Sequence, residues 1–223
     1  MNVVVFGATG MIGQGVLREC LLDPDVQRVV TVGRTPAGRQ DPKLEEIVHG
    51  DLFDLAPVES RLTNLDACFF CLGVSAAGMT EEEYTRVTYG IAMSVAATLA
   101  RLDPQMTFVF VSGAGTDSTE RGRTMWARVK GRTENAILKL PFRRAYMFRP
   151  GFIQPLHGIR SRTKLYRVFY AIAGPLFPLL RRLFPAGVTT SEQLGRAMLA
   201  AAKHGAASPI VDMREINRLA NRR

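Results

Sequence analysis

Short apolar runs rich in Val, Ile and Phe alternate with longer amphipathic stretches through the first two thirds of the chain. The apolar runs predict buried strands at residues 2–6, 26–32, 44–48, 66–72, 106–111 and 144–148. Between them, apolar residues at helical spacing predict helices at residues 11–22, 80–102 and 123–140. Strands that are apolar throughout and separated by helices are typical of a parallel sheet covered on both faces. The pattern therefore predicts an α/β protein with a doubly wound parallel β-sheet.

The last third of the chain is less regular. Residues 165–184 are apolar with embedded Arg, and Pro175 and Pro178 interrupt any helix there. Thr190 is a candidate N-cap for a final helix through Ala202, and a short strand is expected near residues 209–211. Because no change in composition marks a linker, we expect one domain over residues 1–223, in which residues 152–190 form a basic, apolar, irregular lid segment.

Composition narrows the class of protein. With 47% hydrophobic and 22% charged residues, the 223-residue chain is too apolar for disorder and long enough to bury a core. No apolar stretch reaches the roughly 20 residues of a membrane-spanning helix, and the first residues do not resemble a signal peptide. Three cysteines form no disulfide framework. We therefore expect a cytoplasmic protein.

The net charge of +9 is concentrated in one segment. Residues 135–191 contain ten Lys and Arg and no Asp or Glu, whereas acidic residues balance the Lys and Arg elsewhere. Such a segment can meet a phosphate group, an acidic small molecule or a lipid head group, or it can be a solvated basic face. No nucleic-acid-binding motif accompanies it, so we expect no nucleic-acid partner.

A glycine-rich turn follows the first predicted strand and opens the first predicted helix, with the sequence Gly7-Ala-Thr-Gly10-Met-Ile-Gly13. Glycines in this context let the backbone approach a pyrophosphate, and the helix N-terminus offers free N–H groups. The alternative is a glycine turn without a ligand. An NAD site would place an acidic residue at the end of the second strand, where this sequence has Arg34. Arg34 can pair with a 2′-phosphate, which predicts a preference for NADP(H) over NAD(H).

With these motifs the sequence resembles the short-chain dehydrogenase/reductase superfamily, in its extended and atypical branch of epimerase-like and reductase-like proteins. Four further segments are similar to motifs of that branch: residues 49–52 to its adenine-contacting turn, 71–73 to the end of its fourth strand, 109–113 to the strand with its active-site serine, and 149–151 to the turn that flanks the nicotinamide. The resemblance covers residues 1 to about 155 and implies a Rossmann fold that binds NAD(P). The implied cofactor contacts are Gly7, Thr9, Gly10, Met11, Ile12, Gly13, Arg34, Asp51, Leu52, Leu72, Gly73, Lys130, Pro150 and Gly151.

The resemblance also implies a catalytic serine together with a tyrosine and a lysine four residues apart on one helix. Ser112 and Lys130 match, but Trp126 stands at the tyrosine position. An indole N–H donates a hydrogen bond and cannot act as a general acid–base near neutral pH. The family's asparagine falls near Thr88. The catalytic candidates are therefore Ser112, Lys130 and Trp126.

Two classes of function remain. One is an NADP(H)-dependent oxidoreductase or epimerase-like enzyme acting on an unknown small molecule, which the basic segment suggests is anionic. The other is a non-catalytic dinucleotide-binding protein, which senses the cofactor or uses it structurally. Trp126 favours the second class, whereas Ser112 and Lys130 favour the first.

Metal and partner predictions follow from the same sequence. The three histidines lack metal-ligand spacing relative to the cysteines, so no metal site is expected. Residues 164–184 are interpreted as a lid, with weak peripheral membrane contact as the alternative. A homodimer could form through residues 80–102 and the helix that carries Trp126.

Overall fold

The computed structural model describes residues 1–159 and 187–222. In this part of the chain, seven strands form one sheet whose neighbouring strands all pair in parallel, in the order β3-β2-β1-β4-β5-β6-β9. The strands are β1 (Asn2–Phe6), β2 (Arg28–Gly33), β3 (Leu44–Val48), β4 (Ala67–Phe70), β5 (Thr107–Val111), β6 (Arg144–Phe148) and β9 (Ile210–Val211). The chain runs outward from β1 to β3 and then returns to continue from β4. The order is that of a doubly wound sheet, as predicted.

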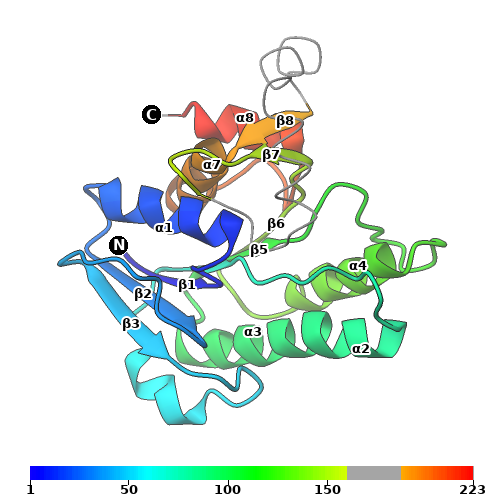
Figure 1. The fold of residues 1–223 in the computed structure, drawn as a ribbon, viewed down its shortest axis with the longest axis horizontal. Coiled ribbons are helices and arrows are strands. Elements are labelled where there is room, and N and C mark those ends of the chain that lie inside the picture. Colours follow the sequence, from blue (N-terminus) through cyan, green and yellow to red (C-terminus); the bar gives the residue numbers. More distant parts are fainter. Residues whose placement is uncertain (160–186, 223) are drawn as a thin grey trace.

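Helices cover both faces of this sheet (Figure 1). One face carries α1 (Met11–Leu22), α7 (Ser191–His204) and α8 (Met213–Ala220). The other carries α2 (Glu81–Thr85), the π-helical turn η2 (Arg86–Gly90), α3 (Ile91–Leu102) and α4 (Met125–Ile137). A 3₁₀ turn, η1 (Ala56–Arg61), lies between β3 and β4 in the sequence.

Two apolar cores form because successive residues of a strand point to opposite faces of the sheet. In β1, Val3 and Val5 belong to the core under α1 and α7, while Val4 and Phe6 belong to the core under α3. Both cores are fully closed to solvent at these positions. This double burial explains why the strands are apolar throughout rather than alternating.

The structure differs from the predicted elements in a few places. The predicted helix at residues 80–102 is interrupted by η2, and the helix predicted to Leu140 ends at Ile137. Helix α8, turn η1 and a separate parallel pair of β7 (Phe152–Gln154) with β8 (Val188–Thr190) were not predicted, because each is too short to show a period. Thr190 caps α7 as predicted, with its side chain accepting a hydrogen bond from Gln193 N. The predicted apolar stretch at 165–184 lies outside the described residues.

Candidate functional site

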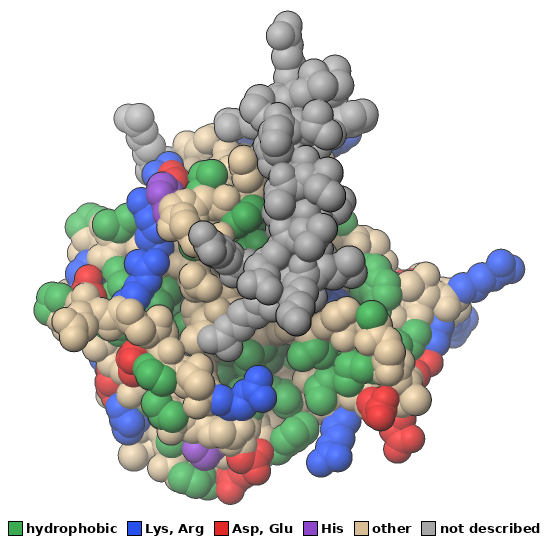
Figure 2. Space-filling view, in the orientation of Figure 1, with side chains coloured by type: hydrophobic (Ala, Val, Ile, Leu, Met, Phe, Trp, Pro, Cys, Tyr) green, Lys and Arg blue, Asp and Glu red, His purple; other side chains and the backbone are tan. Residues whose placement is uncertain are grey.

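The candidate site lies at the carboxyl edge of the sheet, where the strand order reverses between β1 and β4. A cavity of about 510 Å³ opens there. Its walls come from the segments that follow β1, β2, β3 and β4, from η2 and the start of α3, and from Lys130 of α4. Ligands of open α/β sheets bind at such a switch point, because neighbouring connections diverge to opposite faces and leave a crevice. Figure 2 looks onto one face of the molecule, where hydrophobic side chains gather near its centre.

The glycine turn forms one end of this cavity through Gly7, Thr9 and Gly10. Gly7 has a φ of +83°, which favours glycine, and Gly10 N donates to Gly7 O at 2.9 Å to close the turn. A Cβ at Gly13 would lie 2.0 Å from Gly7 O, so only glycine lets α1 approach the turn this closely. Gly10 is the N-cap of α1 and has no side-chain cap, which leaves the first N–H groups of the helix facing outward. These features fit the pyrophosphate of a dinucleotide.

The second end of the cavity is built by the segments after β2 and β3. Arg34, Asp51 and Leu52 line it, together with Phe53, which was not predicted. Phe53 is held in place because Ser94 Oγ donates to its carbonyl oxygen at 2.9 Å and the Arg86 guanidinium lies 5.7 Å from its ring centroid. This end therefore offers a cation, a carboxylate and an aromatic ring.

Lys130 forms the third part of the cavity wall, near Val87 and Thr88 of η2 and Ile91 of α3. Its Nζ donates a hydrogen bond to the carbonyl oxygen of Ser112. Burial lowers the pKa of Lys130 to about 8, although the nearby Glu134 carboxylate acts in the opposite direction. A lysine with such a pKa exchanges its proton near neutral pH more readily than an exposed lysine does.

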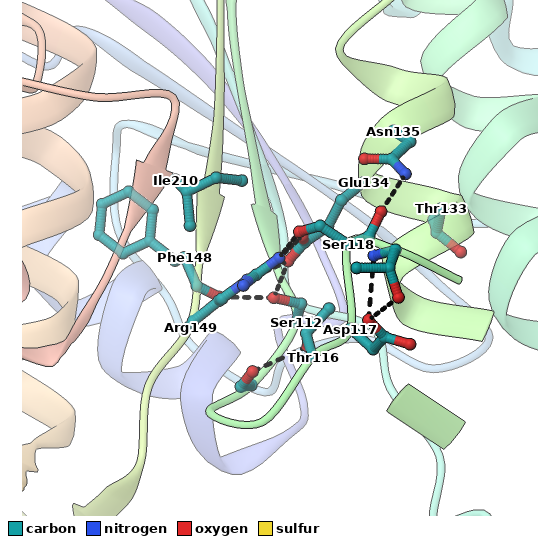
Figure 3. A network of polar contacts seen from close by, with 12 residues as sticks. Ser112, Thr116, Asp117, Ser118, Thr133, Glu134, Asn135, Phe148, Arg149 and Ile210 are labelled. Atoms are coloured by element: carbon teal, nitrogen blue, oxygen red, sulfur yellow. Dashed lines mark hydrogen bonds and ion pairs between the residues drawn. The ribbon is translucent and has the colours of Figure 1, made fainter. Parts of the chain in front are cut away.

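Ser112 is engaged away from the cavity, in a polar network that Figure 3 shows in close-up. Its Oγ donates to Glu134 Oε1 and lies 3.1 Å from the carbonyl oxygen of Phe148. The Glu134 side chain is fully buried and also accepts two hydrogen bonds from the Arg149 guanidinium. Arg149 in turn donates to Ser118 Oγ. The network thus connects the end of β5, the middle of α4 and the end of β6.

The commitment of its hydroxyl proton limits what Ser112 can do in this conformation. A serine has one O–H donor, and here two oxygen acceptors already face it. Ser112 is not among the residues that line the main cavity. To donate to a substrate carbonyl, the hydroxyl would have to rotate away from Glu134.

The other predicted site residues divide into two groups. Nine of the fourteen predicted cofactor contacts line the main cavity: Gly7, Thr9, Gly10, Arg34, Asp51, Leu52, Leu72, Gly73 and Lys130. The remaining five predicted cofactor contacts, Met11, Ile12, Gly13, Pro150 and Gly151, do not line it, and Trp126 does not either. Trp126 is half-buried on α4, with its ring beside Gly115 in the loop after β5.

The sequence did not predict several residues that contribute to the site. Phe53, Val74, Val87 and Ile91 line the cavity, but their apolar side chains carry no motif. Arg149 was noticed only as part of a motif, and its pairing with Glu134 depends on α4 packing against the end of β6. The π-helical turn is a feature often found at functional sites, and no sequence pattern signalled it here.

No group of three or more His, Cys, Asp or Glu side chains in residues 1–159 and 187–222 is arranged to hold a metal ion. Within the same ranges, no helix combines the length and the apolar character needed to cross a bilayer.

Comparison with known proteins gives a family match and distant relatives. Residues 7–138 match a family described as NAD(P)H-binding. "Protein fmp52, mitochondrial" of Emericella nidulans is 31% identical over 159 residues, 68% of this chain and 66% of that protein, so the match spans just under two thirds of the relative. "Protein fmp52-2, mitochondrial" of Aspergillus terreus is 28% identical over 202 residues, 89% of this chain and 85% of that protein.

Solved structures share the fold at low sequence identity. MoeE5 in complex with UDP-glucose and NAD has a TM-score of 0.67 and 19% identity, covering 93% of this chain and 74% of that one. The UDP-glucose 4-epimerase of Thermotoga maritima has a TM-score of 0.65 and 12% identity, covering 99% of this chain and 81% of that one. These similarities show the same Rossmann-like architecture.

Proposed function

Since the chain belongs to the NAD(P)H-binding family, we propose that it is an NADP(H)-dependent oxidoreductase or epimerase-like protein acting on a small, anionic molecule. The resemblance to the short-chain dehydrogenase/reductase superfamily is confirmed by this family and by the fold of the solved neighbours. A nicotinamide dinucleotide is the cofactor of that fold, and MoeE5 was solved with NAD.

The observation that carries the proposal is the continuity of the cavity. One space of about 510 Å³ runs from the glycine turn past Arg34 and Asp51 to Lys130. A dinucleotide has an adenosine half, a pyrophosphate and a nicotinamide half. The turn suits the pyrophosphate, the segments after β2 and β3 suit the adenosine, and Lys130 then lies at the nicotinamide end.

The preference for NADP(H) rests on Arg34. Its side chain lines the cavity at the end of β2, where a guanidinium can bind a 2′-phosphate through two hydrogen bonds. The acidic residue that would bind the ribose hydroxyls of NAD at this position is absent.

The catalytic proposal centres on Lys130. The bound nicotinamide supplies hydride transfer. Lys130 supplies a positive charge and an exchangeable proton at that end of the cavity, with a pKa of about 8. Trp126, one helical turn from Lys130, can donate a hydrogen bond through its indole N–H. Ser112 contributes its carbonyl oxygen as an acceptor for Lys130, and its hydroxyl contributes only if it leaves Glu134.

A second candidate function is a dinucleotide-binding protein without turnover. Two observations favour it: the tyrosine position is occupied by Trp126, and the Ser112 hydroxyl is held by Glu134. In this reading the cofactor is a sensed or structural ligand, and the same cavity serves.

Location and partners stay proposals. We expected a cytoplasmic protein, whereas the curated relatives carry "mitochondrial" in their names. We retain the prediction of a small-molecule substrate and a homodimer without a nucleic-acid partner. The membrane-contact alternative, and six of the ten Lys and Arg of the basic segment, fall on residues 160–186, outside those described.

A binding titration tests the proposal directly. NADPH added to the purified protein should quench the emission of Trp126, the only tryptophan, by energy transfer. Gly10→Val should abolish the binding, because the valine side chain would fill the part of the cavity where the backbone of the glycine turn approaches the pyrophosphate. Ala97→Val, on the exposed side of α3, adds similar bulk outside the cavity and should bind as the wild type does. Unchanged NADPH affinity in a folded Gly10→Val variant would refute the site.

Turnover separates the two candidate functions. A screen of carbonyl compounds and sugar nucleotides with the cofactor that binds should reveal conversion if the protein is an enzyme. Tight NADPH binding without conversion of any of them would favour the binding-protein function.

A further inference from the structure

A carboxylate lies beside the proposed 2′-phosphate site, although it is distant from Arg34 in the sequence. A smaller cavity of about 70 Å³ adjoins the main one and shares Gly7, Thr9 and Arg34 with it. Its wall also includes residues 35–37 after β2 and, from β3, Glu46. Arg34 and Glu46 therefore border the same small space, at the adenosine end of the site.

The two neighbouring carboxylates of β3, Glu45 and Glu46, differ in their partners. Glu45 binds Arg28 and Arg61, which neutralise it. Successive strand residues point to opposite faces, so Glu46 faces the loop after β2, where its Oε1 accepts a hydrogen bond from Ala37 N at 2.7 Å. Within the described residues, no Lys or Arg forms an ion pair with the Glu46 carboxylate.

We propose that Glu46 is a specificity-determining residue that opposes Arg34, so that the protein accepts NADH as well as NADPH and prefers NADPH only modestly. A phosphate monoester carries a charge of about −1.5 to −2 near neutral pH, and a carboxylate without a counter-charge repels it. The 2′-hydroxyl of NADH can instead donate a hydrogen bond to a carboxylate. Glu46 thus plays, from the third strand, a part that NAD sites give to an acidic residue at the end of the second strand.

This inference rests on the proposed function, and calorimetric titration of NADPH and NADH tests both without a known substrate. Glu46→Gln removes the charge and keeps an oxygen that can accept from Ala37 N. We expect the NADPH Kd to fall about five- to tenfold and the NADH Kd to change less than about twofold. A gain of this size is expected for two unit charges about 4 Å apart whose repulsion is screened by water. Added salt should shrink the gain, because ions screen the repulsion.

Glu45→Gln is the matched control, since it makes the same change of charge one residue away on the opposite face of the sheet. It should leave the ratio of NADPH to NADH affinity unchanged. Glu46→Ala adds a second variant, because it removes both the charge and the hydrogen-bond acceptor of the Ala37 loop.

The outcomes separate the inference from the function that it extends. The inference alone would be overturned if the wild type binds the cofactors but Glu46→Gln has the same ratio of NADPH to NADH affinity as the wild type. An equal gain in NADPH affinity in Glu45→Gln would also overturn it. A loss of both cofactors in Glu46→Ala, with Glu46→Gln unchanged, would make Glu46 a support of the loop and also overturn it. Failure of the wild type to bind either cofactor would overturn the proposed function and the inference together.

Discussion

Replacing Glu134 tests whether the buried network holds the site together. The Glu134 side chain has 0% exposure and that of Arg149 has 18%. Glu134→Gln keeps the volume and leaves an oxygen for Ser112, but it leaves the Arg149 guanidinium without its buried counter-charge. Removing one partner of a buried ion pair costs about 3–5 kcal/mol. Because Arg149 keeps some contact with water and with Ser118, we expect a loss near the lower end, about 3 kcal/mol.

Urea unfolding followed by circular dichroism measures this loss. With a typical denaturant dependence of about 1–3 kcal/mol per M, the midpoint should fall by roughly 1–3 M. The matched control is Glu45, whose carboxylate forms ion pairs with Arg28 and Arg61 but whose side chain is 33% exposed. Exposed pairs contribute about 0–1 kcal/mol, so Glu45→Gln should lower the unfolding free energy by less than about 1 kcal/mol.

A double-mutant cycle completes the test. Arg149→Met alone leaves Glu134 buried without a cation, whereas Arg149→Met with Glu134→Gln leaves no buried charge. We expect the double variant to be more stable than the sum of the single losses predicts. Additive losses, or a Glu134→Gln variant within about 1 kcal/mol of the wild type, would refute the role of the pair.

Three further predictions concern the cofactor and catalytic residues. Arg34→Ala should weaken NADPH binding by about 1.5–3 kcal/mol, the strength of a charged hydrogen bond, and leave NADH nearly unchanged in calorimetry; equal losses would remove Arg34 from the 2′-phosphate site. Trp126→Tyr should raise any slow carbonyl reduction about 10²–10⁴-fold in a steady-state assay, because it places a phenol one turn from Lys130; a slower variant would make Trp126 a residue that shapes the substrate. The pKa of Lys130 is lowered from 10.5 to about 8 in the folded state, so the unfolded chain binds more protons between about pH 8 and 10. The unfolding free energy of the wild type should therefore rise with pH in this window relative to that of Lys130→Met. Urea unfolding should show a rise of up to about 1.4 kcal/mol per pH unit. A constant difference between the two proteins across this window would contradict the buried position of Lys130.

The sequence determined the architecture, because the information that specifies it is local. Buried strands need apolar side chains on both faces, so runs such as Asn2–Phe6 are visible without any knowledge of their neighbours. The glycine turn is also local, since the strand, the turn and the helix N-terminus are consecutive. The cavity residues Gly7 and Gly10 could be predicted for this reason, whereas Lys130 was predicted from the resemblance to the family.

Only the tertiary structure decided which distant side chains meet. Glu134 and Arg149 are 15 residues apart and lie on different elements, and their pairing with Ser112 follows from the packing of α4 against β5 and β6. The sequence predicted an active-site hydroxyl at Ser112, whereas the fold supplies that hydroxyl with a buried acceptor. Likewise, Arg34 looked free of acidic neighbours because Glu46 is 12 residues further along the chain, and the pairing of β2 with β3 brings both to one cavity. Contacts between strands and helices depend on packing in three dimensions, and a single sequence carries no periodic signal for them.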